Sequence, residues 1–264
     1  KSPEILEKIR EISVGIFHKL PILLVGGVGT GKTHLVNTIA QQASREILSY
    51  QLSPETDAAS LIGGYIQASD GQFKWSPGPL ALAASKGKWI LLEDVDQAGG
   101  DCFTLIAQLI ERNVLAVAGH GRPIVPHSDF RLFLTQRAND LNSSGLCSSL
   151  YVKCHLVCLP EHTKLSLENI VKAHFPDLLP QILCLPVQIL NAVEQASGGQ
   201  VLNRRLGVRD CLTFARRLSK ARSSSASGSK QVAYALLDAI DVFAAHLHKR
   251  EQKSLFYQRI SDVL

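Results

Sequence analysis

Methionine is absent from all 264 residues, and the aromatic content is only 6%. Without an initiating methionine, the sequence favours a fragment of a longer protein. No stretch reaches the roughly 18 uninterrupted apolar residues that a membrane span needs. The richest candidate, residues 178–193, is interrupted by Pro180 and Pro186. The first eleven residues alternate charged and apolar side chains, a pattern unlike a secretory leader, so we expect neither a membrane span nor a leader.

Disulfide and zinc frameworks are also missing. The six cysteines include no C-x-x-C pair, although Cys147, Cys154 and Cys158 cluster around His155. This spacing favours free thiols over a zinc site, and six unpaired thiols are typical of a reducing compartment, the cytosol or the nucleus.

Charge is unevenly distributed along the chain. Residues 201–264 hold 12 Lys and Arg against 5 Asp and Glu, whereas residues 1–200 hold 16 against 18. A basic C-terminal segment suits an acidic protein surface or RNA, but a solvated helical face explains it more simply. Direct nucleic-acid binding is therefore not expected.

What is present is enough apolar material for a large core, since 45% of the residues are hydrophobic and 19% are charged. Such a composition excludes a disordered tail and a coiled coil. Short buried strands at 21–25, 89–92 and 131–135 are separated by helical segments, including 1–19 and 33–43. Strands alternating with helices in this way predict a parallel sheet covered on both faces.

Strand signals end near Pro160. Beyond it the periodicity predicts four helices, with a flexible Ser-rich connection over 222–230 before the last. These helices span 165–174, 186–195, 206–220 and 232–248. We therefore expect an α/β core over 1–159 and a smaller all-helical domain over 160–264.

Two glycine-punctuated segments, 71–78 and 114–126, interrupt the core and predict inserted β-hairpins. Phe73 and Trp75 in the first suit base stacking, but packing within the insert's own sheet is the favoured interpretation. His120 and His127, in or beside the second, have no acid or nucleophile pattern around them and are expected to be surface polar residues.

The strongest motif is G-x-x-x-x-G-K-T, which follows the first strand and precedes a helix. Its residues are Gly26, Gly27, Val28, Gly29, Thr30, Gly31, Lys32 and Thr33. Glycines allow backbone N–H groups to surround a phosphate, and the helix N-terminus favours an anion. Lys32 is predicted to reach the β- and γ-phosphates, and the Thr33 hydroxyl to bind Mg²⁺. The sequence thus predicts an ATP-Mg²⁺ site.

Two acids, Glu93 and Asp94, end the strand over 89–92. In most ATPases that carry this phosphate-loop motif, an Asp comes first and supports Mg²⁺. A Glu follows it and orients the water that attacks the γ-phosphate. Here the order is reversed. Glu93 can still support Mg²⁺, but the Asp94 side chain is one methylene too short to reach the attacking water. A catalytic group misplaced by about 1 Å can lower the rate ~10²-fold. The reversal weakens hydrolysis more than binding.

These motifs make the chain resemble AAA+ ATPase modules of the MoxR/dynein-related type, and within them the first module of giant ring ATPases of large-ribosomal-subunit assembly. Besides the phosphate loop and the acid pair, the resemblance rests on Thr56-Asp57, Leu61–Tyr65, Gly71–Leu80, Lys86–Asp94 and His127–Phe133. It implies a three-layer P-loop core with a helical lid. By the same resemblance, residues 71–78 belong to the helix-2 insert and residues 114–126 form the pre-sensor hairpin.

The resemblance also assigns roles at single positions. Arg209 stands where the family's lid arginine contacts the γ-phosphate, although a surface charge is the alternative. Arg137 stands where the family has a sensor asparagine, with Asn139 two residues late. Leu150 stands near the position of the arginine finger, which is worth ~10³–10⁵ in rate.

Three functions remain open. An active remodelling ATPase is favoured by the intact phosphate loop and Arg209. A nucleotide-holding module without hydrolysis is favoured by the reversed order of Glu93 and Asp94, by Arg137 and by Leu150. A nucleic-acid module rests on charge alone. The resemblance further implies neighbouring AAA+ modules in a pseudohexameric ring, pre-ribosomal assembly factors as partners, and a nucleolar or nucleoplasmic location.

Overall fold

A computed structural model describes most of the chain as two compact units. The described residues are 3–67, 71–117, 123–138, 151–176, 184–196, 207–223, 237, 241–243, 247 and 250–263. The first unit comprises residues 1–27 and 31–160, and the second comprises residues 28–30 and 161–264.

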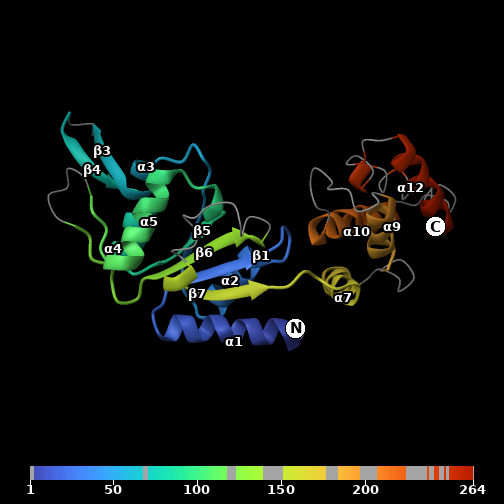
Figure 1. The fold of residues 1–264 in the computed structure, drawn as a ribbon, viewed down its shortest axis with the longest axis horizontal. Coiled ribbons are helices and arrows are strands. Elements are labelled where there is room, and N and C mark those ends of the chain that lie inside the picture. Colours follow the sequence, from blue (N-terminus) through green and yellow to red (C-terminus); the bar gives the residue numbers. More distant parts are fainter. Residues whose placement is uncertain are drawn as a thin grey trace. The chain divides into compact units, whose positions relative to one another are not determined.

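The first unit is built on a five-stranded sheet in which every neighbouring pair is parallel (Figure 1). Its order is β2-β5-β6-β1-β7. The strands are β1 (Ile22–Gly26), β2 (Ile47–Gln51), β5 (Trp89–Glu93), β6 (Arg131–Arg137) and β7 (His155–Leu159). The predicted α/β class, parallel sheet and three central strands are confirmed. The fifth strand, β7, begins at His155, shortly after the helical residues 151–153.

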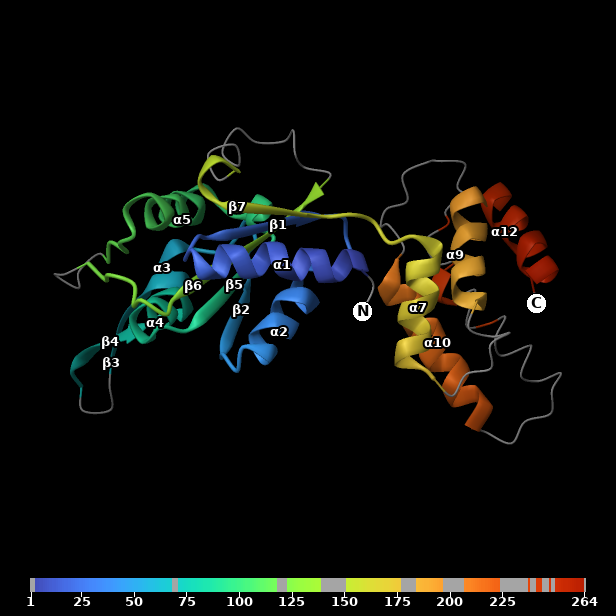
Figure 2. The ribbon, with the colours of Figure 1, turned by 90° about the horizontal axis from the view of Figure 1, so that it is seen from below.

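Helices cover both faces of this sheet because alternate strand side chains point to opposite sides. Figure 2 shows α1 and α2 lying over the sheet as one group, separate from the group of α3, α4 and α5. Leu24, Leu91 and Phe133 pack with side chains of the first pair, and Leu23, Ile90 and Leu134 with those of the second group. The helices are α1 (Pro3–Phe17), α2 (Lys32–Gln42), α3 (Ala58–Ile62), α4 (Pro79–Lys86) and α5 (Gly100–Arg112).

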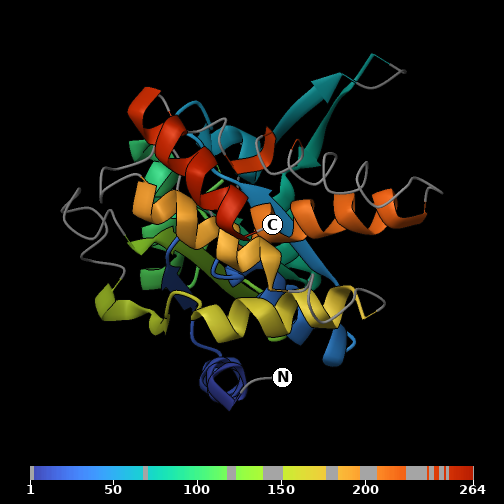
Figure 3. The same ribbon diagram turned by 90° about the vertical axis from the view of Figure 1, so that its right-hand side faces the viewer.

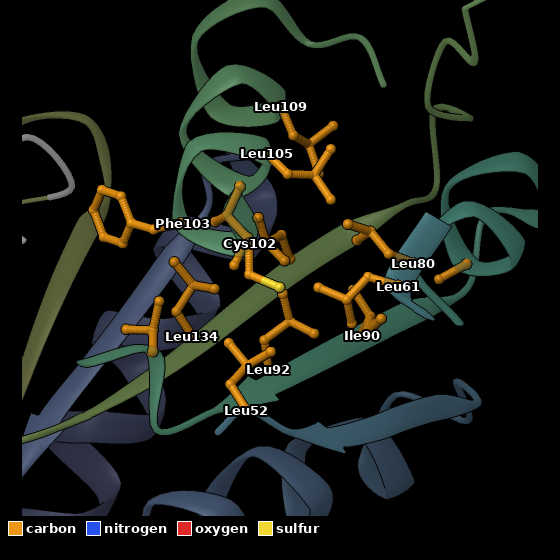
Figure 4. Close-up of a cluster of buried hydrophobic side chains, with 14 of the residues drawn as sticks. Leu52, Leu61, Leu80, Ile90, Leu92, Cys102, Phe103, Leu105, Leu109 and Leu134 are labelled. Carbon is orange, nitrogen blue, oxygen red and sulfur yellow. The ribbon is translucent and has the colours of Figure 1, made fainter. Parts of the chain in front are cut away.

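The larger of the two apolar clusters lies between α5 and the sheet (Figure 4). Cys102 and Leu105 enter it from the helix, and Ile90, Leu92 and Leu134 enter it from the strands. The five cysteines within the described ranges are free thiols. Burial raises the pKa of the Cys102 thiol, and it raises that of the Cys154 thiol to about 12.

The first insert is an antiparallel hairpin, as predicted, and it projects from the rest of the first unit in Figure 1. The predicted segment 71–78 supplies only its second strand, β4 (Phe73–Pro77), because the first strand, β3 (Gly63–Gln67), lies earlier in the chain. Trp75 pairs with Tyr65 across the strands, edge to face at 5.5 Å between ring centroids, so this ring packs within the insert as expected. Phe73 is 70% exposed. Of the second insert, the structure describes the bridge between Leu115 and Ile124; residues 118–122, with His120, lie outside the described ranges.

The base of the hairpin is a backbone-to-backbone contact between Gly63 and Gly78. Gly63 has φ +110°, a conformation open almost only to glycine, and a Cβ there would lie 2.2 Å from the Ser76 carbonyl oxygen. A Cβ on Gly78 would lie 2.5 Å from the Leu61 carbonyl oxygen. The Gly78 N–H donates to the Ile62 carbonyl at 2.8 Å. No side chain fits between the two segments.

The second unit, in its described parts, consists of helices (Figure 3). Their buried side chains form one apolar cluster. They are α7 (Lys164–His174), α9 (Leu185–Ala196), α10 (Val208–Ser223) and α12 (Arg250–Val263). Phe214, Phe243 and Phe256 are fully buried in the cluster. Three predicted helices correspond to α7, α9 and α10. Of the predicted helix 232–248, the structure describes residues 237, 241–243 and 247, and 237 and 241–243 are helical.

Two boundaries in this unit differ from the prediction. Helix α10 continues through Arg222 and Ser223, so the start of the predicted flexible connection is helical instead; residues 224–230 lie outside the described ranges. Helix α12 was not predicted, because its sequence is mostly polar and its apolar face is narrow. Among the described helices, none is both long and apolar enough to cross a membrane.

We predict that Gly63→Ala destabilises the first unit by about 2 kcal/mol or more, because the new Cβ meets backbone atoms that have no room to move. Gly64→Ala is the matched control: a Cβ there meets no atom within 4 Å, and its effect should stay within about 0.5 kcal/mol. Urea denaturation of both variants measures the difference. Equal midpoints would contradict the interpretation of the hairpin base.

Candidate nucleotide-binding site

The phosphate-loop motif connects β1 to α2, at the edge of the sheet where the parallel strands end. Gly29 and Gly31 have φ of +82° and +86°, the left-handed conformation that glycine adopts without strain. Gly31 is the N-cap of α2 and supplies no side-chain cap, and a Cβ placed on it would meet no atom within 4 Å. The first N–H groups of α2 are thus left uncovered by a capping side chain, as anion binding requires.

Lys32 is held against this loop by two backbone carbonyls. Its Nζ donates to the oxygens of Gly26 and Gly27, each at 2.8 Å. Burial lowers the pKa of Lys32 from 10.5, and the negative charge of Asp94 partly opposes that shift. Burial of the charged Lys32 ammonium is therefore unfavourable, and an anionic ligand beside it would offset this desolvation free energy.

Thr33 and Glu93 come together although they lie 60 residues apart. The Thr33 Oγ1 donates a hydrogen bond to Oε2 of Glu93, at the end of β5. A hydroxyl and a carboxylate oxygen in contact fit a magnesium ion, which binds few protein ligands and takes the others from phosphates and water. Within the described ranges no group of three or more His, Cys, Asp or Glu residues is arranged to hold a metal by itself. The residues present thus fit a magnesium ion that binds together with the phosphates of a nucleotide.

Asp94 follows β5 in a left-handed conformation, with φ 56° and ψ 53°. Its backbone N–H donates to the Thr135 hydroxyl at 3.1 Å. Its carboxylate Oδ2 accepts from Arg137 Nη2 at 2.8 Å and from Gln51 Nε2 at 3.3 Å. The acid that sequence analysis placed at the attacking water is therefore engaged by a cation and an amide from two neighbouring strands.

Sequence analysis missed Gln51 and Asp96 as parts of this cluster. Asp96 Oδ1 accepts from the Arg137 backbone N–H at 3.4 Å, and Asp96 Oδ2 accepts from Gln97 Nε2 at 2.9 Å. Arg137 ends β6, the strand beside β5, which places its side chain close to the acids that end β5. No spacing along the sequence shows which strands are neighbours, so this proximity is visible only in the structure.

The remaining predicted residues are placed separately. Arg209 lies exposed in the first turn of α10 in the second unit, where its carbonyl accepts from the Thr213 hydroxyl at 2.8 Å. Its contact with a γ-phosphate stays a prediction. Asn139 and Leu150 lie outside the described ranges. His127 accepts the Asp129 N–H through Nδ1 at 3.2 Å and packs beside Gly87, far along the chain from the phosphate loop.

Two models of known protein families match this chain. A model described as the AAA domain of the dynein-related subfamily matches residues 21–152, half of the chain. The chain belongs to the dynein-related AAA family. A second model, the midasin AAA lid domain, matches residues 166–264, so the AAA module is followed by a midasin-type lid. The resemblance to AAA+ modules of the dynein-related type is confirmed.

Individual relatives agree with this assignment. Midasin of Dictyostelium discoideum is 32% identical over 132 residues, 49% of this chain and 2% of that protein. Midasin of Giardia intestinalis is 28% identical over 143 residues, 53% of this chain and 3% of that protein. Protein CbbQ of Hydrogenophilus thermoluteolus is 25% identical over 130 residues, 49% of this chain and 48% of that protein. The chain thus spans only a small part of the midasins it matches.

A solved structure, a Thermotoga maritima RuvB mutant, resembles the fold with a TM-score of 0.57 over 89% of this chain and 68% of that one, at 15% identity. This likeness bears on the fold alone. Dynein-related AAA modules bind ATP with Mg²⁺ as a family, and the midasin-like module here is of the kind found in ring-shaped AAA+ ATPases.

The lowered pKa of Lys32 gives a pH test. Between the folded pKa and the unfolded value of 10.5, the unfolded chain binds more protons than the folded AAA module, so the stability contributed at this position rises with pH. We expect the melting temperature of the wild type to increase relative to that of Lys32→Met between neutral pH and about pH 10. Thermal denaturation at both pH values measures this difference. A constant or falling difference would contradict the burial of the ammonium.

Proposed function

We propose that this chain binds ATP-Mg²⁺ at the phosphate loop and works as one module of a ring-shaped remodelling ATPase. The observation that supports it best is the convergence of Lys32, Thr33 and Glu93 at one edge of the sheet, with Lys32 bound to loop carbonyls and Thr33 bound to Glu93. In this proposal Lys32 and the loop N–H groups bind the phosphates. Thr33 and Glu93 hold Mg²⁺, which neutralises phosphate charge when bound.

The two parts of the chain have distinct tasks in this proposal. Residues 1–159 form the nucleotide-binding core with its two inserts, and residues 160–264 form the helical lid. Arg209, exposed in the first turn of α10, contacts the γ-phosphate from the lid. Exchange of the nucleotide then moves the lid, and the inserts transmit that motion to a partner. The match of residues 166–264 to a midasin lid supports this division.

The larger protein is proposed to release assembly factors from large-subunit pre-ribosomes in the nucleolus or nucleoplasm. Its partners are then the neighbouring AAA+ modules of the ring and those pre-ribosomal factors. The support is the similarity of the AAA module and the lid to midasins.

A second function, nucleotide holding without hydrolysis, is favoured by the contacts of Asp94. Hydrolysis requires a group that accepts a proton from the water that attacks the γ-phosphorus, and ADP is then the leaving group. Asp94 is the candidate acceptor, but its side chain is short and its Oδ2 is already bonded to Arg137 and Gln51. In this alternative the module binds ATP and gives the ring its shape.

Calorimetric titration with ATP-Mg²⁺ tests the binding. We expect Lys32→Ala to lose binding, because the ammonium is the cation fixed at the loop. Lys88→Ala is the matched control, since Lys88 precedes β5 at the other end of that strand and pairs with Glu46 at 2.6 Å. Lys88→Ala should bind as the wild type does. A folded wild type that binds no ATP would overturn the proposal.

The magnesium assignment has its own test. We expect the affinity of the wild type for ATP to fall when Mg²⁺ is removed with a chelator, and the affinity of Glu93→Gln to respond far less, because the carboxylate that supports the cation is neutral. The titrations are repeated with and without Mg²⁺. An equal response in both proteins would show that Glu93 does not serve the cation.

Turnover separates the two functions. In the complete ring, a Lys32→Ala change confined to this module should reduce ATP hydrolysis measured per ring if the module is an active ATPase. Unchanged hydrolysis, with binding at this module lost, would favour the nucleotide-holding module.

A further inference from the structure

Arg137 lies at the centre of the charged groups around the candidate site. It ends β6, donates from Nη2 to Asp94 Oδ2 at 2.8 Å, and has its backbone N–H directed to Asp96 Oδ1 at 3.4 Å. The Asp94 side chain is only 16% exposed and that of Arg137 is 41% exposed. The carboxylate is therefore largely shielded from water, while the guanidinium that pairs with it is partly exposed to solvent.

The charge of Arg137 is also felt at the phosphate loop. It contributes to lowering the pKa of Lys32, whereas Asp94, Asp96 and Glu93 act in the opposite direction. Arg137 is thus close enough to Lys32 for the two cations to repel each other. An anion placed between them would relieve this repulsion.

We propose that the Arg137 guanidinium is shared between the Asp94 carboxylate and the terminal phosphate of ATP, so that the ion pair with Asp94 opposes ATP binding specifically. The inference rests on the proposed ATP binding. A guanidinium forms strong paired hydrogen bonds with either a carboxylate or a phosphate, and the phosphate brings the larger charge. ADP lacks the terminal phosphate and leaves the ion pair as it is. The pair therefore makes the module distinguish ATP from ADP.

The consequence for Asp94 follows from the same competition. While Arg137 holds its carboxylate, the negative charge that would attract a proton from water is neutralised. When the terminal phosphate engages Arg137, Asp94 keeps only the amide of Gln51 among these two donors. In this scheme the acid becomes available only when ATP is bound.

A double-mutant cycle tests the sharing. Asp94→Asn removes the competing charge, so the affinity for ATP should rise about tenfold and that for ADP should change less than about twofold. Arg137→Gln should lower the affinity for ATP about tenfold and leave ADP nearly unchanged. In the double variant, the gain from Asp94→Asn should disappear, because it acts only through Arg137. Calorimetric titration with Mg²⁺ and each nucleotide measures all four proteins, and thermal denaturation confirms that each is folded.

Asp96→Asn is the matched control for charge. It removes the same charge near Lys32 but keeps an oxygen that accepts the Arg137 N–H, and the guanidinium pair remains. Its effect on ATP and on ADP should be similar.

Two outcomes overturn the inference while leaving nucleotide binding intact. One is that Asp94→Asn tightens ATP and ADP equally, as Asp96→Asn is expected to do; the other is that its gain persists in the double variant. A folded wild type that binds neither nucleotide would instead overturn the proposed function, and the inference with it.

Discussion

Burial of the parallel sheet on both faces is the constraint on which the first unit depends. Because β1, β5 and β6 are apolar on both sides, helices must cover each face, and every connection between neighbouring strands must cross over the sheet. The carboxyl ends of these strands then meet at one edge. The phosphate loop, the Glu93–Asp94 pair and Arg137 are brought together there by topology, although more than 100 residues separate the first from the last.

At this edge the physical problem is the balance of charge. Lys32 and Arg137 face the carboxylates of Glu93, Asp94 and Asp96 in a partly desolvated cluster. Each carboxylate has its own donor: Thr33 for Glu93, Arg137 for Asp94 and Gln97 for Asp96. Lys32 instead contacts neutral carbonyls, so it is the cation most readily turned toward a ligand. In the proposed function, phosphate binding and water activation thus fall to different residues, Lys32 and Asp94, and of the two side chains only Asp94 is held by an ion pair.

The sequence predicted the features that have a local pattern and not those that depend on contacts between distant segments. The central strands and the phosphate loop were predictable because both are local patterns, an apolar run and a fixed spacing. The edge strand β2 was not identified because none of its five residues is fully buried. Helix α12 was missed because Phe256 is the one fully buried apolar residue among those of the helix whose burial the structure describes. The pairing of Arg137 with Asp94 was not foreseen, because it depends on which strand lies beside β5 and not on any spacing along the chain. The reversed order of Glu93 and Asp94 was visible in the sequence, but the pairing of Asp94 with Arg137 was visible only in the structure.

The hairpin of β3 and β4 divides into two regions that evolution can treat differently. At its base, Gly63 and Gly78 touch through backbone alone, so neither position tolerates a side chain. Beyond it, Tyr65, Ile66 and Phe73 are exposed and support no part of the core. Substitutions near the tip therefore cost little folding free energy. A lineage can alter what this arm presents to its surroundings while the nucleotide-binding edge of the same unit stays unchanged.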